Sequence, residues 1–271
     1  MSGKIVFTAC SDARKETDEA EIEKLKSLLE GYGLEVIKSR YLYEDKAAGK
    51  EKADELSAFF SDEDITAIFD VSGGNVANEL LPYLNYEVIA KSQAIFWGYS
   101  DLTTIINAIY AKTGKASMLY QVRHLLENED RQLTKIKYHF LQGEEISGVL
   151  VGGNLRCFLK LAGTEYMPEL TGKVLLMEAL GGDIYSVRTM LASLEQIGVF
   201  RKIKGIVVGT FTSLMREGQY EDFLDLLRKY VPKDMPIAVT GDIGHGKDAK
   251  GILIGREIRL LDRKEVENGI I

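Results

Sequence analysis

The sequence predicts an α/β protein built on mostly parallel β-sheets. Short apolar runs rich in β-branched residues alternate along the chain with segments whose apolar residues recur at helical spacing. This alternation favours parallel strands covered by helices on both faces. The chain has 271 residues, of which 45% are apolar and 28% charged, as in ordinary globular proteins. That length suits two domains.

In the first part of the chain, apolar runs separate amphipathic segments. The run from Lys4 to Ala9 contains Ile, Val and Phe and predicts a buried strand. Further strands are expected at 34–38, 66–71 and 94–97, and helices at 18–29, 46–60 and 102–112. These elements form the first expected domain, residues 1–125.

A polar segment from Gln121 to Glu145 interrupts the pattern, and we place the crossover between domains there, as a linker over 126–145. The pattern then resumes in a second domain, residues 146–271. Its expected strands are 148–151, 173–178, 205–208 and 236–239, and its expected helices are 155–161, 184–197 and 220–230. The last segment, 251–261, alternates around Gly255 and predicts a hairpin that closes this domain.

Charge and cysteine content exclude several classes of protein. The net charge of −7 argues against nucleic-acid binding, which needs clustered Lys and Arg. Cys10 and Cys157 form no CxxC pair, so neither a disulfide framework nor a metal site is indicated. The N-terminus has no apolar signal segment, and no apolar run reaches the roughly 18 residues that span a bilayer. We therefore expect a soluble cytoplasmic protein with no membrane partner.

Ser100 is the first candidate for chemistry. A strand runs into Gly98-Tyr99-Ser100 and directly on into a helix, which places the serine on a sharp turn. The helix N-terminus offers free N–H groups to developing negative charge. The segment lacks the final glycine of the G-x-S-x-G pattern, and taken alone it favours Ser100 as a helix cap over a nucleophile.

A serine nucleophile needs a base and a group that orients the base. His245 lies in a loop after a strand, whereas His124 and His139 lie in polar stretches near the crossover that we expect to be helical. Glu178 ends the apolar run from Lys173, so its buried carboxylate needs a partner, either a histidine or a basic residue such as Arg188. The order Ser, Glu, His along the chain occurs in known serine hydrolases.

Two similar turns, Ser72-Gly73-Gly74-Asn75 and Val151-Gly152-Gly153-Asn154, each follow a strand and precede a helix that asparagine can cap. We expect Gly73 or Gly74, with the N–H of Asp101, to form an oxyanion hole, although the same glycines also suit a plain turn. We assign Ser72, Asn75 and Tyr99 to substrate binding.

Several ordered blocks carry a resemblance that covers nearly the whole chain. They are Ser72-Gly73-Gly74, Leu80-Leu81-Pro82-Tyr83-Leu84, Gly98-Tyr99-Ser100-Asp101, Gly148-Val149-Leu150-Val151-Gly152-Gly153-Asn154-Leu155, Leu161-Ala162-Gly163-Thr164, Leu176-Met177-Glu178 and Gly244-His245-Gly246. With these blocks the chain resembles the serine peptidases that include muramoyl-tetrapeptide L,D-carboxypeptidases and microcin C self-immunity proteins.

The resemblance implies that Ser100 is the nucleophile, His245 the general base and Glu178 its orienting partner. It also implies a first domain like that of class I glutamine amidotransferases, a smaller second domain of the swivelling α/β type, and a homodimer. This sequence departs from the family at Ser72, where an Arg is common, and at Tyr120-Gln121, where Gly-Pro is common. Gly182 and its neighbours replace an expected acidic residue.

The resulting hypothesis is a serine-type L,D-carboxypeptidase of peptidoglycan recycling. It would cleave the amide to a terminal D-amino acid in a murein tetrapeptide without a cofactor. Two alternatives remain open at this point: a hydrolase of peptidyl-nucleotide conjugates, and a small-molecule binding protein of the same fold. A glutamine amidotransferase is excluded because position 100 is a serine and that reaction needs a cysteine.

Overall fold

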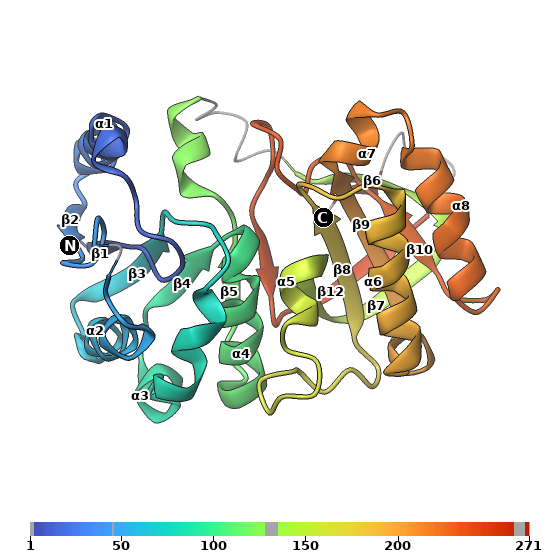
Figure 1. Cartoon of the computed structure of the whole chain (residues 1–271), viewed down its shortest axis with the longest axis horizontal. Coiled ribbons are helices and arrows are strands. Elements are labelled where there is room, and N and C mark those ends of the chain that lie inside the picture. Colours follow the sequence, from blue (N-terminus) through green and yellow to red (C-terminus); the bar gives the residue numbers. More distant parts are fainter. Residues whose placement is uncertain (1–2, 45, 128–134, 263–268, 271) are drawn as a thin grey trace.

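The chain folds around two β-sheets that lie side by side, each flanked by helices (Figure 1). This computed structural model describes residues 3–44, 46–127, 135–262 and 269–270. The two-domain α/β class expected from the sequence is thereby confirmed at the level of two parallel-rich sheets.

The first sheet has six strands in the order β11-β5-β4-β3-β1-β2. They are β1 (Lys4–Thr8), β2 (Glu35–Lys38), β3 (Ile65–Asp70), β4 (Ile95–Gly98), β5 (Ser117–Leu119) and β11 (Ile252–Ile254). All neighbours pair in parallel except β11, which runs antiparallel to β5. Its helices are η1 (Glu16–Asp18), α1 (Glu19–Gly31), α2 (Gly49–Ser61), η2 (Ala77–Tyr83), α3 (Tyr86–Lys91), η3 (Ser100–Leu102), α4 (Thr103–Thr113) and η4 (Val122–Leu126).

The second sheet has seven strands in the order β12-β7-β8-β9-β10-β6-β13. They are β6 (Lys137–Gln142), β7 (Glu145–Asn154), β8 (Val174–Ala179), β9 (Gly205–Phe211), β10 (Ile237–Val239), β12 (Glu257–Leu261) and β13 (Gly269–Ile270). The central strands β7 to β10 are parallel, and β6, β12 and β13 pair antiparallel. The helices are α5 (Leu155–Leu159), α6 (Ile184–Gln196), η6 (Val199–Arg201), α7 (Thr212–Arg216) and α8 (Tyr220–Tyr230).

The strands and helices expected from apolar periodicity are confirmed in both halves, but the hairpin expected at 251–261 is wrong. β11 pairs with β5 in the first sheet, whereas β12 pairs with β7 in the second. The chain around Gly255 therefore passes from one sheet to the other instead of folding back on itself. The expected linker also contains a strand, β6, that pairs with β10, so the helical stretch expected around His139 is wrong. Residues 128–134 of that linker lie outside the described residues.

Alternating residues of β1 face two different cores. Ile5 and Phe7 pack with buried residues of α1 and η4, such as Ile22 and Val122. Val6, between them, belongs to a larger cluster that continues through α4 and α5 into the second sheet. One contiguous core therefore joins the two sheets.

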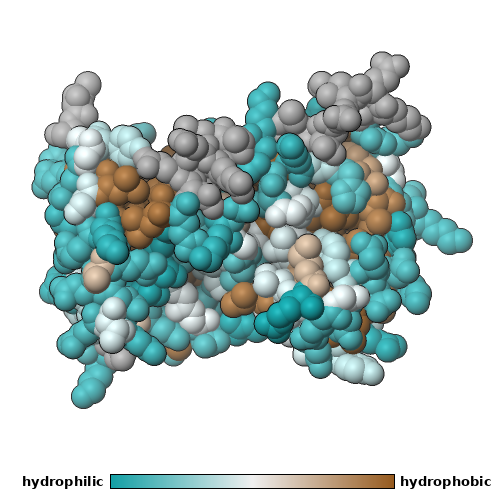
Figure 2. Space-filling view, turned by 90° about the horizontal axis from the view of Figure 1, so that it is seen from above, coloured by the Kyte–Doolittle hydropathy of each residue, from teal (hydrophilic) through white to brown (hydrophobic). Residues whose placement is uncertain are grey.

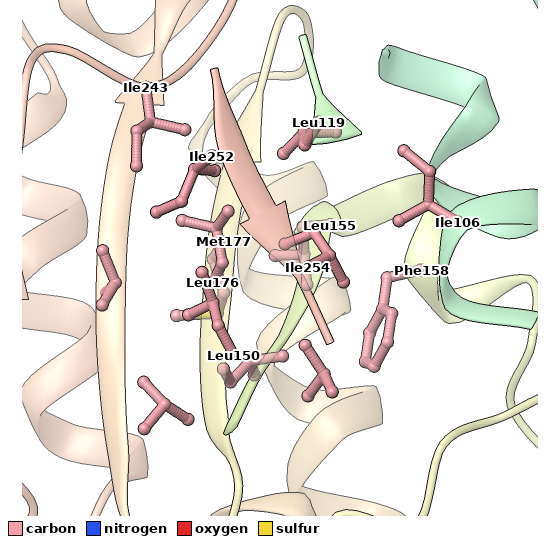
Figure 3. Packing of buried hydrophobic residues seen from close by; sticks show 14 of the residues in the cluster. Ile106, Leu119, Leu150, Leu155, Phe158, Leu176, Met177, Ile243, Ile252 and Ile254 are labelled. Atoms are coloured by element: carbon pink, nitrogen blue, oxygen red, sulfur yellow. The ribbon is translucent and has the colours of Figure 1, made fainter. Parts of the chain in front are cut away.

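The junction between the sheets is apolar and tightly filled. Figure 3 shows Ile106 of α4 and Leu119 of β5 close to Leu155 and Phe158 of α5, with Ile254 of β11 among them. These side chains are at most 4% exposed. Burial of apolar surface on this scale stabilises one relative placement of the sheets, and that placement positions the candidate site.

The face of the molecule seen from above is mostly hydrophilic, with apolar areas in each half (Figure 2). Within the part of the chain that the structure describes, no helix is both long enough and apolar enough to cross a membrane.

Candidate active site

Ser100 begins the 3-10 turn η3, directly after β4. Its φ is +55°, and among the described residues it is the one non-glycine residue with positive φ. The left-handed conformation costs about 1–2 kcal/mol for a residue with a Cβ, and such strain concentrates at functional sites. Tyr99, and not Ser100, is the residue that precedes the turn as N-cap. The helix-cap interpretation of Ser100 is therefore wrong.

Glu178 and His245 form a close pair. Glu178 lies near the end of β8 and is 1% exposed, and its Oε2 is 2.6 Å from His245 Nδ1. Arg188, the alternative partner considered for Glu178, is exposed on α6. The other ring nitrogen, His245 Nε2, is buried and has no hydrogen-bond partner among the described residues. A histidine held through Nδ1 with Nε2 free has the arrangement of a general base.

Tyr99 connects the turn of Ser100 to the loop of His245. The two rings, of Tyr99 and His245, lie 4.3 Å apart between centroids. The Tyr99 hydroxyl donates a hydrogen bond to the Gly244 carbonyl at 3.3 Å. Burial raises the pKa of the Tyr99 phenol far above its usual range, so the hydroxyl remains a donor. Tyr99 thus positions His245 relative to the turn that carries Ser100.

The carboxylate of Asp101, the residue after Ser100, is fully buried and has several partners. Ser11 Oγ and the Ala77 N–H donate to its Oδ2 at 2.7 and 2.9 Å. Lys160 forms an ion pair with its Oδ1. Since Ala77, Ser11 and Lys160 lie on three different segments, this carboxylate fixes the turn that carries Ser100. From the sequence, only the backbone N–H of Asp101 was expected to have a role.

The turn at 73–75 lies beside the serine turn and is held on two sides. Asp12 Oδ1 accepts a hydrogen bond from the Asn75 N–H at 3.1 Å. Arg156 donates to the Asn75 side-chain oxygen at 2.9 Å and to the Gly74 carbonyl at 3.3 Å. Lys160 donates to the Asn75 carbonyl at 2.7 Å. Segments of both sheets therefore meet at this turn.

A pocket of about 770 Å³ opens between these elements. Its lining comprises Gly74, Asn75, Ser100, Asn154, Arg156, Ala179, Leu180, Gly181, Gly182, Ser186, Thr189 and Met190. A volume of this order suits a small-molecule or peptide substrate. Ser100, Gly74 and Asn75 line this pocket together, whereas Glu178 and His245 are not among its lining residues.

Two of the expected substrate-binding residues lie elsewhere. Ser72 is 1% exposed, and its hydroxyl donates to Asp70 and accepts from the Ser11 N–H. Tyr99 lines a smaller cavity beside Glu178. Neither side chain belongs to the lining of the pocket at Ser100. Ser72 and Tyr99 adjoin Gly73 and Ser100 in the sequence, but the local sequence does not show that their side chains point into the protein.

His124 was set aside in the sequence analysis, but it lies close to the site. Its ring is 6.1 Å from that of Tyr99, centroid to centroid, and burial together with Arg123 lowers its pKa. A neutral His124 adds no positive charge beside His245 at neutral pH. Among the described residues, no cluster of three or more His, Cys, Asp or Glu side chains is arranged to hold a metal ion.

Comparison with known proteins matches both halves of the chain to domains of the same family. The N-terminal domain of LD-carboxypeptidases matches residues 5–120, and the C-terminal domain matches residues 147–260. A probable murein peptide carboxypeptidase of Bacillus subtilis is 28% identical, with 88% of this chain and 83% of that protein covered. The microcin C7 self-immunity protein of Escherichia coli is also 28% identical, with coverages of 80% and 77%.

A solved structure has the same fold. The structure of an MccF-like protein from Bacillus anthracis superposes with a TM-score of 0.86 at 22% identity and covers 99% of this chain and 96% of that one. At this level of identity the likeness is one of fold. It extends over both sheets.

Proposed function

Because this chain belongs to the LD-carboxypeptidase family, we propose that it is a serine carboxypeptidase that acts through Ser100, His245 and Glu178. The observation that supports this most is the 2.6 Å contact between His245 Nδ1 and Glu178 Oε2, with Nε2 left free. A buried carboxylate that orients a histidine in this way favours one tautomer and stabilises the imidazolium that forms during proton transfer.

In the proposed mechanism Ser100 attacks the carbonyl carbon of the scissile amide while its proton passes to His245 Nε2. The oxyanion accepts hydrogen bonds from the backbone N–H of Gly73 or Gly74 and from that of Asp101. The protonated His245 then donates to the leaving amine, and the amide C–N bond breaks. Water then attacks the acyl-enzyme while His245 takes its proton, and His245 returns that proton to Ser100 Oγ as the bond between Oγ and the acyl carbon breaks and the acid leaves. The residues of this chain supply every proton transfer, so the reaction needs no cofactor.

The proposed substrate is a murein tetrapeptide, with hydrolysis of the L,D-amide bond to its terminal D-amino acid. The relative in Bacillus subtilis, named for murein peptides, supports this choice. The relative in Escherichia coli, named for microcin C7 self-immunity, favours the second candidate, a peptidyl-nucleotide conjugate. Both candidates share the acyl-enzyme chemistry and differ only in the group that leaves.

The assignment of domains also remains a proposal. We propose a first domain over 1–125, a crossover over 126–145 and a second domain over 146–271, with β11 returning to the first sheet. A class I glutamine amidotransferase-like first domain and a swivelling-type second domain are part of the same proposal. So are a homodimeric state and a cytoplasmic location, which suit peptidoglycan recycling.

Incubation with a disaccharide-tetrapeptide tests the substrate directly. We expect free D-alanine from the wild-type protein and none above background from Ser100→Ala, measured by chromatography. A matched assay with an aspartyl or glutamyl sulfamoyl nucleoside distinguishes the second candidate. Cleavage of the nucleoside conjugate alone would remove the murein assignment, and cleavage of neither by a folded protein would remove both.

A further inference from the structure

One charged side chain lines the pocket beside Ser100. Of the twelve described residues in that lining, Arg156 alone carries a charge, and the others are polar, small or apolar. It is the second residue of α5 and lies two residues after Asn154, which also lines the pocket. A single cation in an otherwise uncharged pocket creates a localised preference for an anionic group.

The charge of Arg156 is not neutralised within the part of the chain that the structure describes. Its two printed contacts are to neutral oxygens, the Asn75 side-chain oxygen at 2.9 Å and the Gly74 carbonyl at 3.3 Å. Lys160, four residues later, differs because it forms an ion pair with the buried carboxylate of Asp101. Of these two cations, Arg156 is therefore the one available to a ligand.

The contacts of Arg156 also fix where its charge lies. They bind the guanidinium to the turn at 73–75, whose Gly74 lines the pocket together with Ser100. A guanidinium has five N–H donors, and these two contacts leave others free. A planar fork of donors suits a carboxylate, which it binds through two parallel hydrogen bonds.

We propose that Arg156 binds the terminal carboxylate of the substrate and so selects peptides that end in a free acid. This inference rests on the proposed function, because a carboxypeptidase substrate has its carboxylate on the residue that leaves. In such a substrate the anion lies one residue from the scissile carbonyl, within the same pocket. Arg156 is a specificity-determining residue that contacts substrate and takes no part in proton transfer.

The test is a binding measurement that does not depend on turnover. Ser100→Ala protein is titrated calorimetrically with a murein tetrapeptide that ends in D-alanine and with the same peptide as its C-terminal amide. We expect the acid to bind about 10- to 100-fold more tightly than the amide, as for a charge-assisted bidentate contact. In Ser100→Ala with Arg156→Gln, the acid should lose this advantage while the affinity for the amide changes little.

Two matched variants refine the result. Arg188→Gln removes the same charge from an exposed site on α6 and should preserve the preference for the acid. Arg156→Lys keeps the charge without the fork and should retain only part of the preference. The inference is overturned if the parent protein binds neither peptide or binds both equally. It is also overturned if Arg156→Gln keeps the preference, or if it weakens acid and amide alike.

This outcome is separable from that of the proposed function. A preference for the acid that depends on Arg156, together with no release of D-alanine by the wild-type protein, would leave the carboxylate site in place and remove the hydrolase. Release of D-alanine by the wild-type protein, with the preference for the acid unchanged in Arg156→Gln, would support the hydrolase and remove the carboxylate site at Arg156.

Discussion

The chain contains two Gly-Gly-Asn turns, at 73–75 and at 152–154, and they serve different purposes. The second turn is buried, and its polar groups are satisfied within the protein. Asn107 accepts from the Gly152 N–H at 2.8 Å and donates to the Gly152 carbonyl at 2.9 Å. Thr103 accepts from the Asn154 N–H, and the Asn154 side chain caps α5 at Cys157.

The first turn is more exposed to solvent, and side chains from other segments of the chain hold it in place. Asn75 is exposed, and its contacts come from Asp12, Arg156 and Lys160. Its Gly74 lines the pocket next to Ser100. The second turn therefore serves mainly as a structural joint between the sheets and reaches the pocket only through Asn154, whereas the first turn forms a wall of the candidate active site through Gly74 and Asn75. Substitutions in the two turns should separate effects on folding from effects on activity.

The largest effect should follow Gly74→Ala. Gly74 has φ +141°, and an added Cβ would lie 2.1 Å from the carboxyl carbon of Asp12, so either the turn or the Asp12 side chain that accepts from the Asn75 N–H must shift. If its N–H contributes to the oxyanion hole, kcat/KM should fall about 100- to 1,000-fold, measured by D-alanine release. Gly114→Ala is the control, since it has positive φ at the far end of α4 from Ser100 and nothing near its added Cβ. Equal losses in the two variants would contradict the role of the first turn.

A smaller effect, and one on stability, should follow Gly152→Ala. An added Cβ would lie 2.3 Å from the Leu176 carbonyl oxygen at φ +101°, and β7 pairs with β8 at that position. We expect the free energy of unfolding to fall by about 3 kcal/mol, from strain and disrupted pairing. Urea denaturation followed by circular dichroism measures it. A loss no greater than that of Gly114→Ala would show that the second turn is not a structural joint.

The smallest expected effect is a difference in the free energy of unfolding between substitutions of Asn154 and Asn75. Asn154→Ala removes a helix cap and should lower the free energy of unfolding by about 1 kcal/mol. Asn75→Ala should lower it by less than about 0.5 kcal/mol, because Asn75 is exposed and caps no helix. Thermal unfolding of the two variants side by side checks this ranking, and the reverse order would contradict the comparison.

Asn75 and Asn154 also show that one local sequence pattern can lead to two different structures. The same local pattern predicted two caps, but the first turn leads into the 3-10 helix η2, whose N-cap is Val76. Strands and helices with clear apolar periodicity were predicted because their burial leaves a local pattern. β11 and β12 were paired with each other because Gly255 lies between them, whereas their partners β5 and β7 are more than 100 residues away in the chain.

The residues of the candidate site divide in the same way, into those with a local sequence signal and those without one. Ser100, Glu178 and His245 stood out through strand ends and loops, and the contact of Glu178 with His245 agrees with that expectation. Arg156 and Lys160 gave no such signal, because they act across the junction of the sheets on a turn about 80 residues earlier. Only the three-dimensional fold brings these cations to Asn75.

Reaction with a fluorophosphonate probe, followed by intact-mass and peptide mass spectrometry, tests the central claim most directly. We predict one adduct per chain on Ser100, no adduct in Ser100→Ala, and slower labelling in His245→Ala because the base that activates the serine is lost. A folded wild-type protein that remains unlabelled, or one labelled at a residue other than Ser100, would contradict the account.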